Sequence, residues 1–214
     1  MPKYNGSIEA AVADNGSRKC KAKGCPKNRY RLSGYCAHHT SRNNLNGHPT
    51  APPFRAYKHF QDYYEVAQQI VQQNNDTHPG IKFGLSTIER YLTAAKLGST
   101  FLSMNLAECL VQGIEKGATA EDMLAVAGGL YAFSNTIQGS ELQHNDRFMT
   151  TMLGYNMLKV RKSSGFPYGG ARRELGKLVQ DELGVLLIRL EQSILKRMKL
   201  EEDALKYQQM DIPV

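Results

Sequence analysis

The chain has 214 residues, of which 41% are hydrophobic and 22% charged, and its net charge is +7. No run of eighteen or more apolar residues occurs, and the N-terminus lacks the apolar block of a secretory signal. We therefore expect an intracellular protein, located in the cytoplasm and not in a membrane. Thiols stay reduced there, so clustered cysteines are expected to bind metal and not to form disulfides.

Residues 1–17 mix small and polar groups without a sustained periodicity. We expect a loosely ordered tail, in which only residues 8–12 could form one helical turn.

The most informative stretch is residues 20–39, which has the spacing C-x4-C-x10-C-x2-H. Its metal-ligand candidates are Cys20, Cys25, Cys36 and His39. Three thiolates and one imidazole are the donor set of a closed tetrahedral zinc site. Because few apolar residues surround them, the metal must supply the folding energy of this module. The alternative is a group of free cysteines in a basic loop.

Local features around these residues predict the shape of the module. Gly24 and Gly34 stand where a knuckle or tight turn needs a residue without a Cβ. Residues 28–35 alternate like a short hairpin, and the residues after Cys36 predict a short helix ending near Gly47. His38 competes with His39 as the ligand, because adjacent helical residues point about 100° apart and only one of the two can face the metal.

Charge is distributed unevenly along the chain. Residues 1–60 hold eleven basic and two acidic residues, a balance of +9, whereas the remaining 154 residues hold sixteen basic and eighteen acidic residues, a balance of −2. A basic module joined to a near-neutral body is typical of nucleic-acid binding. The candidate nucleic-acid contacts are Lys19, Lys21, Lys23, Lys27, Arg29, Arg31 and Arg42.

A resemblance to a known family rests on several of these residues together. The C-x4-C-x10-C-x2-H spacing, the Gly-Tyr pair before Cys36, Arg42 three residues after His39, and the Gly-x-Pro of residues 47–49 resemble the small zinc-binding module of bacteriophage proteins, found beside HNH homing endonucleases. The resemblance covers residues 18–50 and implies an accessory DNA-binding element that binds Zn²⁺, in the cytoplasm of a bacterial host.

Beyond a proline-rich linker at 51–53, residues 54–214 predict an all-α domain of five or six helices. Helices are expected at 54–73, at 86–97 after a Ser86–Glu89 capping box, at 100–116, from Thr119 to about Gly139, at 141–162 and at 171–208. Cys109 is expected to be a buried, structural thiol. The last helix carries an apolar stripe that includes Leu186, and its length suits either backing the bundle or pairing with another chain.

The predicted fold is therefore mainly α, with a tail (1–17), a zinc module (18–50), a linker (51–53) and a helical domain (54–214). His144, Asn145 and Asp146 are a poor match to an HNH nuclease, because they lie in a helical pattern without preceding strands. We expect a non-catalytic DNA-binding protein whose helical domain oligomerises or recruits a partner, as an accessory or regulator in transcription, replication or packaging. The alternative is a protein-interaction module in which zinc only stabilises a docking surface.

Overall fold

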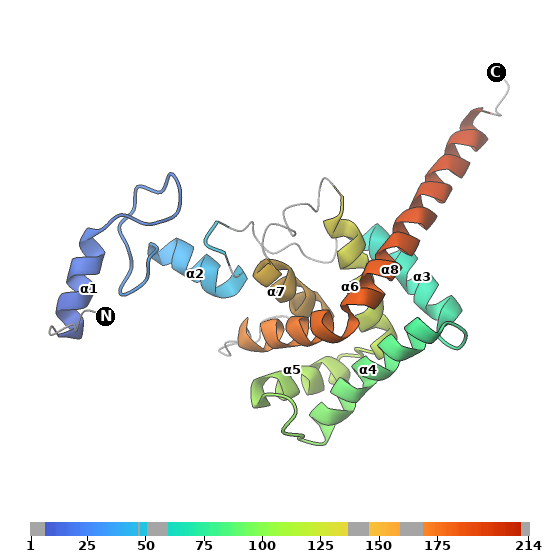
Figure 1. The fold of residues 1–214 in the computed structure, drawn as a ribbon, viewed down its shortest axis with the longest axis horizontal. Coiled ribbons are helices and arrows are strands. Elements are labelled where there is room, and N and C mark those ends of the chain that lie inside the picture. The colour runs from blue at the N-terminus through green and yellow to red at the C-terminus, as the bar shows by residue number, and fades with distance from the viewer. Residues whose placement is uncertain (1–6, 47, 51–59, 137–145, 159–168, 211–214) are drawn as a thin grey trace. The chain divides into compact units, whose positions relative to one another are not determined.

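The computed structural model describes residues 7–46, 48–50, 60–136, 146–158 and 169–210. Within these ranges it contains eight α-helices, and its only extended pairing is an isolated bridge, which confirms the expected mainly-α fold. The chain divides into two compact units, Met1–Pro53 and Phe54–Val214 (Figure 1). We call them the N-terminal unit and the helical unit, and each is described by itself.

The N-terminal unit begins with a helix where a loose tail was expected. Helix α1 (Ile8–Ser17) is capped by Ser7, whose Oγ accepts a hydrogen bond from the Ala10 N–H at 3.2 Å. None of its residues is buried. Residues 8–12 are helical, as the sequence allowed, but the helix continues to Ser17. The sequence did not predict this extension because no apolar stripe marks the helix, and its N-terminus depends on a polar cap.

Between α1 and α2 (Ala37–Asn46) the chain makes two close turns. Lys19 and Asn28 form the antiparallel bridge, and the Tyr30 N–H donates to the Tyr35 carbonyl at 2.8 Å. The expected hairpin over 28–35 is therefore a tight turn without a strand ladder. Helix α2 confirms the short helix expected after Cys36.

Six helices make up the described part of the helical unit: α3 (Gln61–Asn74), α4 (Pro79–Lys96), α5 (Met104–Glu115), α6 (Ala120–Ser134), α7 (Asp146–Met157) and α8 (Gly169–Met210). This matches the expected number. Residues 51–59, which include the predicted linker and the predicted start of the first helix at Phe54, lie outside the described residues.

Helix α4 starts earlier than the Ser86 capping box predicted. Pro79 occupies its first turn, and Nδ1 of His78 accepts a hydrogen bond from the Ile81 N–H at 3.4 Å. A proline at this position removes an N–H that has no helical partner, so it favours a helix start. Ser86 lies inside the helix and donates from Oγ to the Phe83 carbonyl. Gly98, at φ 65°, follows its end as predicted.

Helices α5 and α6 are shorter than expected. Helix α5 begins after Ser103, whose Oγ accepts from the Leu106 N–H, and not at Thr100. Helix α6 begins after Thr119 as predicted but ends at Ser134, and Gly139 lies outside the described residues. Helix α7 covers the middle of the predicted 141–162 segment.

Helix α6 forms the centre of the unit. Thirteen of its fifteen residues are buried, and it contacts α3, α4, α7 and α8. Gly128 and Gly129 permit these contacts, as predicted: an added Cβ would lie 2.4 Å from Leu190 Cδ2 or 2.9 Å from the Tyr64 backbone. Because α6 is surrounded on all sides, its burial has no single face.

Helix α8 packs along the bundle and then extends past it (Figure 1). The buried stripe of the helix contains Leu187 and not the predicted Leu186, which is half-buried and faces Gly80 and Gly84 of α4. Helices α7 and α8 pack so closely that their backbones are in contact. An added Cβ on Gly176 would lie 1.8 Å from the Thr150 oxygen, and one on Gly154 would lie 1.9 Å from the Arg172 oxygen.

Candidate metal centre

Four ligand candidates from three local structures meet in the N-terminal unit. Cys20 follows α1 at the bridge, where its N–H donates to the Lys27 carbonyl at 2.9 Å. Cys25 follows Gly24, whose φ of 74° turns the chain back toward Cys20. Cys36 directly precedes α2 and accepts the Thr40 N–H at its carbonyl, and His39 lies on the first turn of that helix. Residues three apart on a helix share a face, so Cys36 and His39 converge.

The distances among these groups fit a tetrahedral metal ion. The Cys25 and Cys36 sulfurs are 3.9 Å apart, and Nδ1 of His39 lies 3.4 Å from Cys20 Sγ and 3.5 Å from Cys36 Sγ. Bonds of about 2.3 Å to sulfur and about 2.0 Å to nitrogen give tetrahedral edges of about 3.8 Å between sulfurs and about 3.5 Å between sulfur and nitrogen. All four ligand atoms lie within 4.8 Å of one another. The cluster can therefore hold a metal ion.

Of the two adjacent histidines, the one in the cluster is His39. Its ring contributes Nδ1, whereas His38 is exposed and is not part of the group. The two rings meet edge to face, with centroids 5.3 Å apart. The helix geometry thus separates the two candidates that the sequence left open.

The surroundings favour thiolate at one of the cysteines. Desolvation raises the pKa of Cys20, but hydrogen bonds from the Cys36 and Ala22 N–H groups and from His39 outweigh it and lower the pKa to about 6. At Cys25 the Lys27 N–H lowers the pKa, while desolvation and the neighbouring thiols raise it more. A metal needs its ligands deprotonated, so the lowered pKa prepares Cys20 for binding.

The ligands also form the core of their own unit. The buried cluster there consists of Cys20, Ala22 and Cys36, with Cys25 and Tyr35 packed against it. So small an apolar core does not offset the entropy of ordering the chain. A set of four protein ligands leaves no coordination position for substrate, which is typical of a structural and not a catalytic site.

The residues predicted to bind nucleic acid differ in the contacts that their side chains make within the protein. Lys21, Lys23 and Lys27 are exposed, and their ammonium groups form no hydrogen bond or ion pair with the described residues. Lys19 donates from Nζ to the Pro26 carbonyl and to Asn28 Oδ1. Arg31 lies over the Tyr30 ring at 5.2 Å, and Arg42 is half-buried on α2. The three free lysines are therefore the groups most available to an anion.

Arg29 serves the fold, which the sequence did not indicate. Its Nε donates to the Lys19 carbonyl at 3.0 Å, and its Nη1 donates to Asn15 Oδ1 at 3.2 Å. The side chain is half-buried. A substitution at Arg29 would therefore disturb the module as well as remove a charge, and it does not isolate a nucleic-acid contact.

Asn15 joins α1 to the turn at residues 30–33, and sequence analysis missed it. Its Nδ2 donates to the carbonyls of Arg31 and Ser33, both at 2.7 Å. The first of these acceptors, Arg31, has φ 51°, a left-handed conformation that costs a residue with a side chain about 1–2 kcal/mol. The Asn15-Gly16 pair is a helix-end signal that could have revealed α1, but not its partner.

Two other groups that the sequence singled out, Cys109 and the pair His144 and Asn145, are not part of the described metal cluster. Cys109 is fully buried in α5, where desolvation raises its pKa to about 11, in agreement with a structural thiol. His144 and Asn145 lie outside the described residues.

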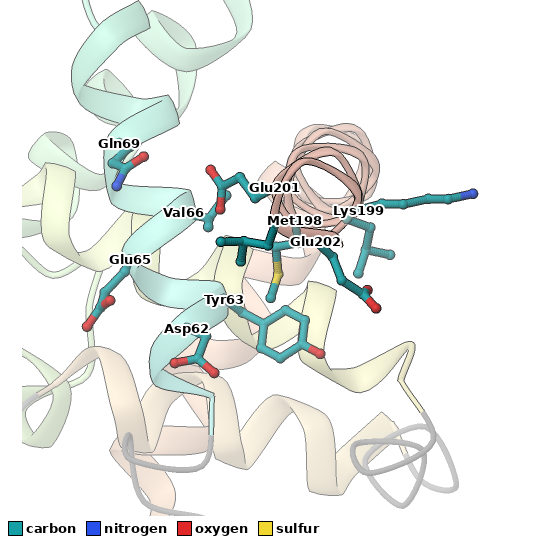
Figure 2. Close-up of a pocket in the computed structure, with 11 residues that line it drawn as sticks. Asp62, Tyr63, Glu65, Val66, Gln69, Met198, Lys199, Glu201 and Glu202 are labelled. Carbon is teal, nitrogen blue, oxygen red and sulfur yellow. The ribbon is translucent and has the colours of Figure 1, made fainter. Parts of the chain in front are cut away.

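A separate groove in the helical unit lies between α3 and the C-terminal part of α8 (Figure 2). Its volume is about 550 Å³, and its wall includes Val66 and Met198. The charged residues lining it are mostly acidic: Asp62, Glu65, Glu201 and Glu202, with Lys199 as the single cation among them. This surface would repel a polyanion.

Comparison with known proteins provides no relative for this chain: no protein family, curated protein or solved structure matches it. Among the described helices, none is both long enough and apolar enough to cross a membrane.

Proposed function

We propose that this protein binds one Zn²⁺ through Cys20, Cys25, Cys36 and His39, and that the metal organises a DNA-binding module. The observation that supports zinc is the match between the ligand distances and the edges of a sulfur-rich tetrahedron. Soft thiolates with an imidazole favour zinc over the hard cations, which prefer oxygen ligands. The ion supplies structural stability and performs no chemistry on a substrate.

DNA is the proposed partner because of the charge around this centre. Residues 18–50 contain eight basic residues and no acidic one. Lys21, Lys23 and Lys27 extend from the loop that the metal would hold, so zinc binding would fix their spacing. Fixed cations gain affinity for phosphates because less conformational entropy is lost on binding.

The helical unit is proposed to serve in assembly, by oligomerisation or by recruiting a protein partner. The acidic residues in the groove between α3 and α8 argue against a second contact with nucleic acid. Its long helix α8 exposes Leu200 and Leu205, both about 60% accessible, in its C-terminal part. We propose no catalytic activity for either unit.

Metal content and a salt titration test this proposal on the full-length protein. The purified chain should contain one zinc per molecule. Its affinity for a mixed-sequence DNA duplex should fall by about 0.9 log units per decade of salt for each phosphate contacted. Replacing Lys23 by Gln should lower that slope by about one unit without loss of zinc. Arg29 is avoided as a test because it supports the fold.

A zinc-containing protein without salt-dependent DNA binding would overturn the DNA proposal. The zinc knuckle would then be a structural support for a protein-docking surface, which is the second candidate function. The same titration with single-stranded RNA and DNA distinguishes the nucleic acids.

A further inference from the structure

The turn at residues 30–33 presents apolar side chains to solvent at the most basic part of the chain. Leu32 is 64% exposed and Tyr30 is 43% exposed, with Arg31 between them. In so small a unit these side chains could have enlarged a core that contains only the ligands, Ala22 and Tyr35. We call residues 30–32 the tip.

The tip is held in place from both sides. The Tyr30 N–H donates to the Tyr35 carbonyl at 2.8 Å, and the Ser33 N–H donates to the Tyr30 carbonyl at 3.0 Å. Asn15 donates to the carbonyls on either side of Leu32. Because Arg31 is kept in a left-handed conformation, Leu32 occupies the apex of a turn that is fixed before any partner arrives.

The side chains around the tip indicate which kind of ligand it binds. Arg31 lies against the Tyr30 ring, and residues 18–50 contain no acidic side chain. A rigid apolar apex beside a guanidinium complements a surface that is anionic at its edge and apolar within. The stacked bases of duplex DNA between two phosphate strands have this character, and leucine is one of the side chains that separate base steps from the minor groove.

We propose that the tip contacts bases, with Leu32 inserted at a base step of duplex DNA and Arg31 in the adjoining minor groove. This inference rests on the proposed DNA-binding function and assigns phosphate contacts and base contacts to different residues. The exposed lysines contact phosphates and set the salt dependence, whereas Leu32 provides a contact that does not depend on salt. Asn15 is a positioning residue for the tip.

The test compares Leu32→Ala with Ile8→Ala in the full-length, zinc-loaded protein. Ile8 is 72% exposed on α1, two helical turns from Asn15, so it is a matched aliphatic control outside the tip. Affinity for a mixed-sequence duplex is measured across a range of salt concentrations. Leu32→Ala should weaken binding about tenfold at every salt concentration and leave the slope unchanged, because it removes apolar burial and no charge. Ile8→Ala should match the wild type.

A plasmid relaxed by topoisomerase in the presence of the protein provides a second readout. A side chain inserted between base pairs unwinds DNA, so the wild type should change the linking number and Leu32→Ala should not. Zinc content shows that both variants remain folded.

The outcomes separate this inference from the function on which it rests. Salt-dependent binding by the wild type, with Leu32→Ala unchanged in affinity and in plasmid unwinding, would overturn the tip contact and leave the DNA proposal intact. Loss of affinity confined to single strands would also overturn insertion into a duplex. No binding by the wild type at low salt would overturn the function itself.

Discussion

The two units of this chain are stabilised in different ways. In the helical unit, α6 is enclosed by other helices, and aliphatic side chains fill the interior. In the N-terminal unit the buried cluster consists of Cys20, Ala22 and Cys36, two of which are candidate metal ligands. A unit with its own apolar core folds without a cofactor, whereas one built around its ligands takes its folding energy from the ion. The comparison predicts that the units respond independently to metal and to core substitutions.

The largest effect is expected from removing a ligand. Cys36→Ser should abolish zinc binding and unfold the N-terminal unit, because metal binding contributes about 10–16 kcal/mol of apparent free energy in modules of this kind. The helical unit should keep its thermal transition. Circular dichroism and metal analysis of the variant measure both, and melting of the whole protein would contradict two independent units.

Thiol reactivity gives a control for the same comparison. After chelation of the metal, three thiols should react quickly with a disulfide reagent at pH 8. Cys109 should react only when the helical unit unfolds, because burial raises its pKa to about 11 and thiolate is scarce at that pH. Four fast thiols would mean that the helical unit also opens without metal.

The second-largest effect is expected from a substitution at the backbone contact between α7 and α8. Gly176→Ala places a methyl group against the Thr150 carbonyl and should destabilise the helical unit by about 3 kcal/mol or more. Gly184→Ala is the control on the same helix. Nothing lies within 4 Å of its added Cβ, so it should stabilise α8 by about 0.5–1 kcal/mol. Thermal unfolding should show opposite shifts, with zinc content unchanged. Equal shifts would refute the close contact.

The smallest effect concerns the attachment of α1. Asn15→Ala removes three hydrogen bonds and should destabilise the N-terminal unit by about 1–3 kcal/mol. Because folding and metal binding are coupled, zinc affinity in a chelator competition should fall about fivefold to a hundredfold. Asp14→Ala, which removes only the exposed ion pair with Arg18, should change it little. An unchanged affinity for Asn15→Ala would show that α1 does not support the knuckle.

Helix boundaries show where local signals sufficed. Thr119 and Gly98 acted as predicted, because a cap or a left-handed glycine works within a few residues of its own position. The helix start predicted at Ser86 was wrong, because the same capping pattern also occurs inside a helix, and this helix begins at Pro79. A local signal predicts a possible boundary, and the surrounding helix determines whether it is used.

The sequence by itself determined the three candidate thiol ligands and the predominance of helices. Cysteine spacing restricts which groups can meet around an ion, and apolar periodicity is a property of each segment alone. Only the tertiary structure decided that His39 and not His38 joins the cluster, that Asn15 holds the turn around Leu32, and that Leu187 and not Leu186 enters the core. Each of these depends on a partner distant in the sequence or on the rotation of a helix, and no local pattern specifies either.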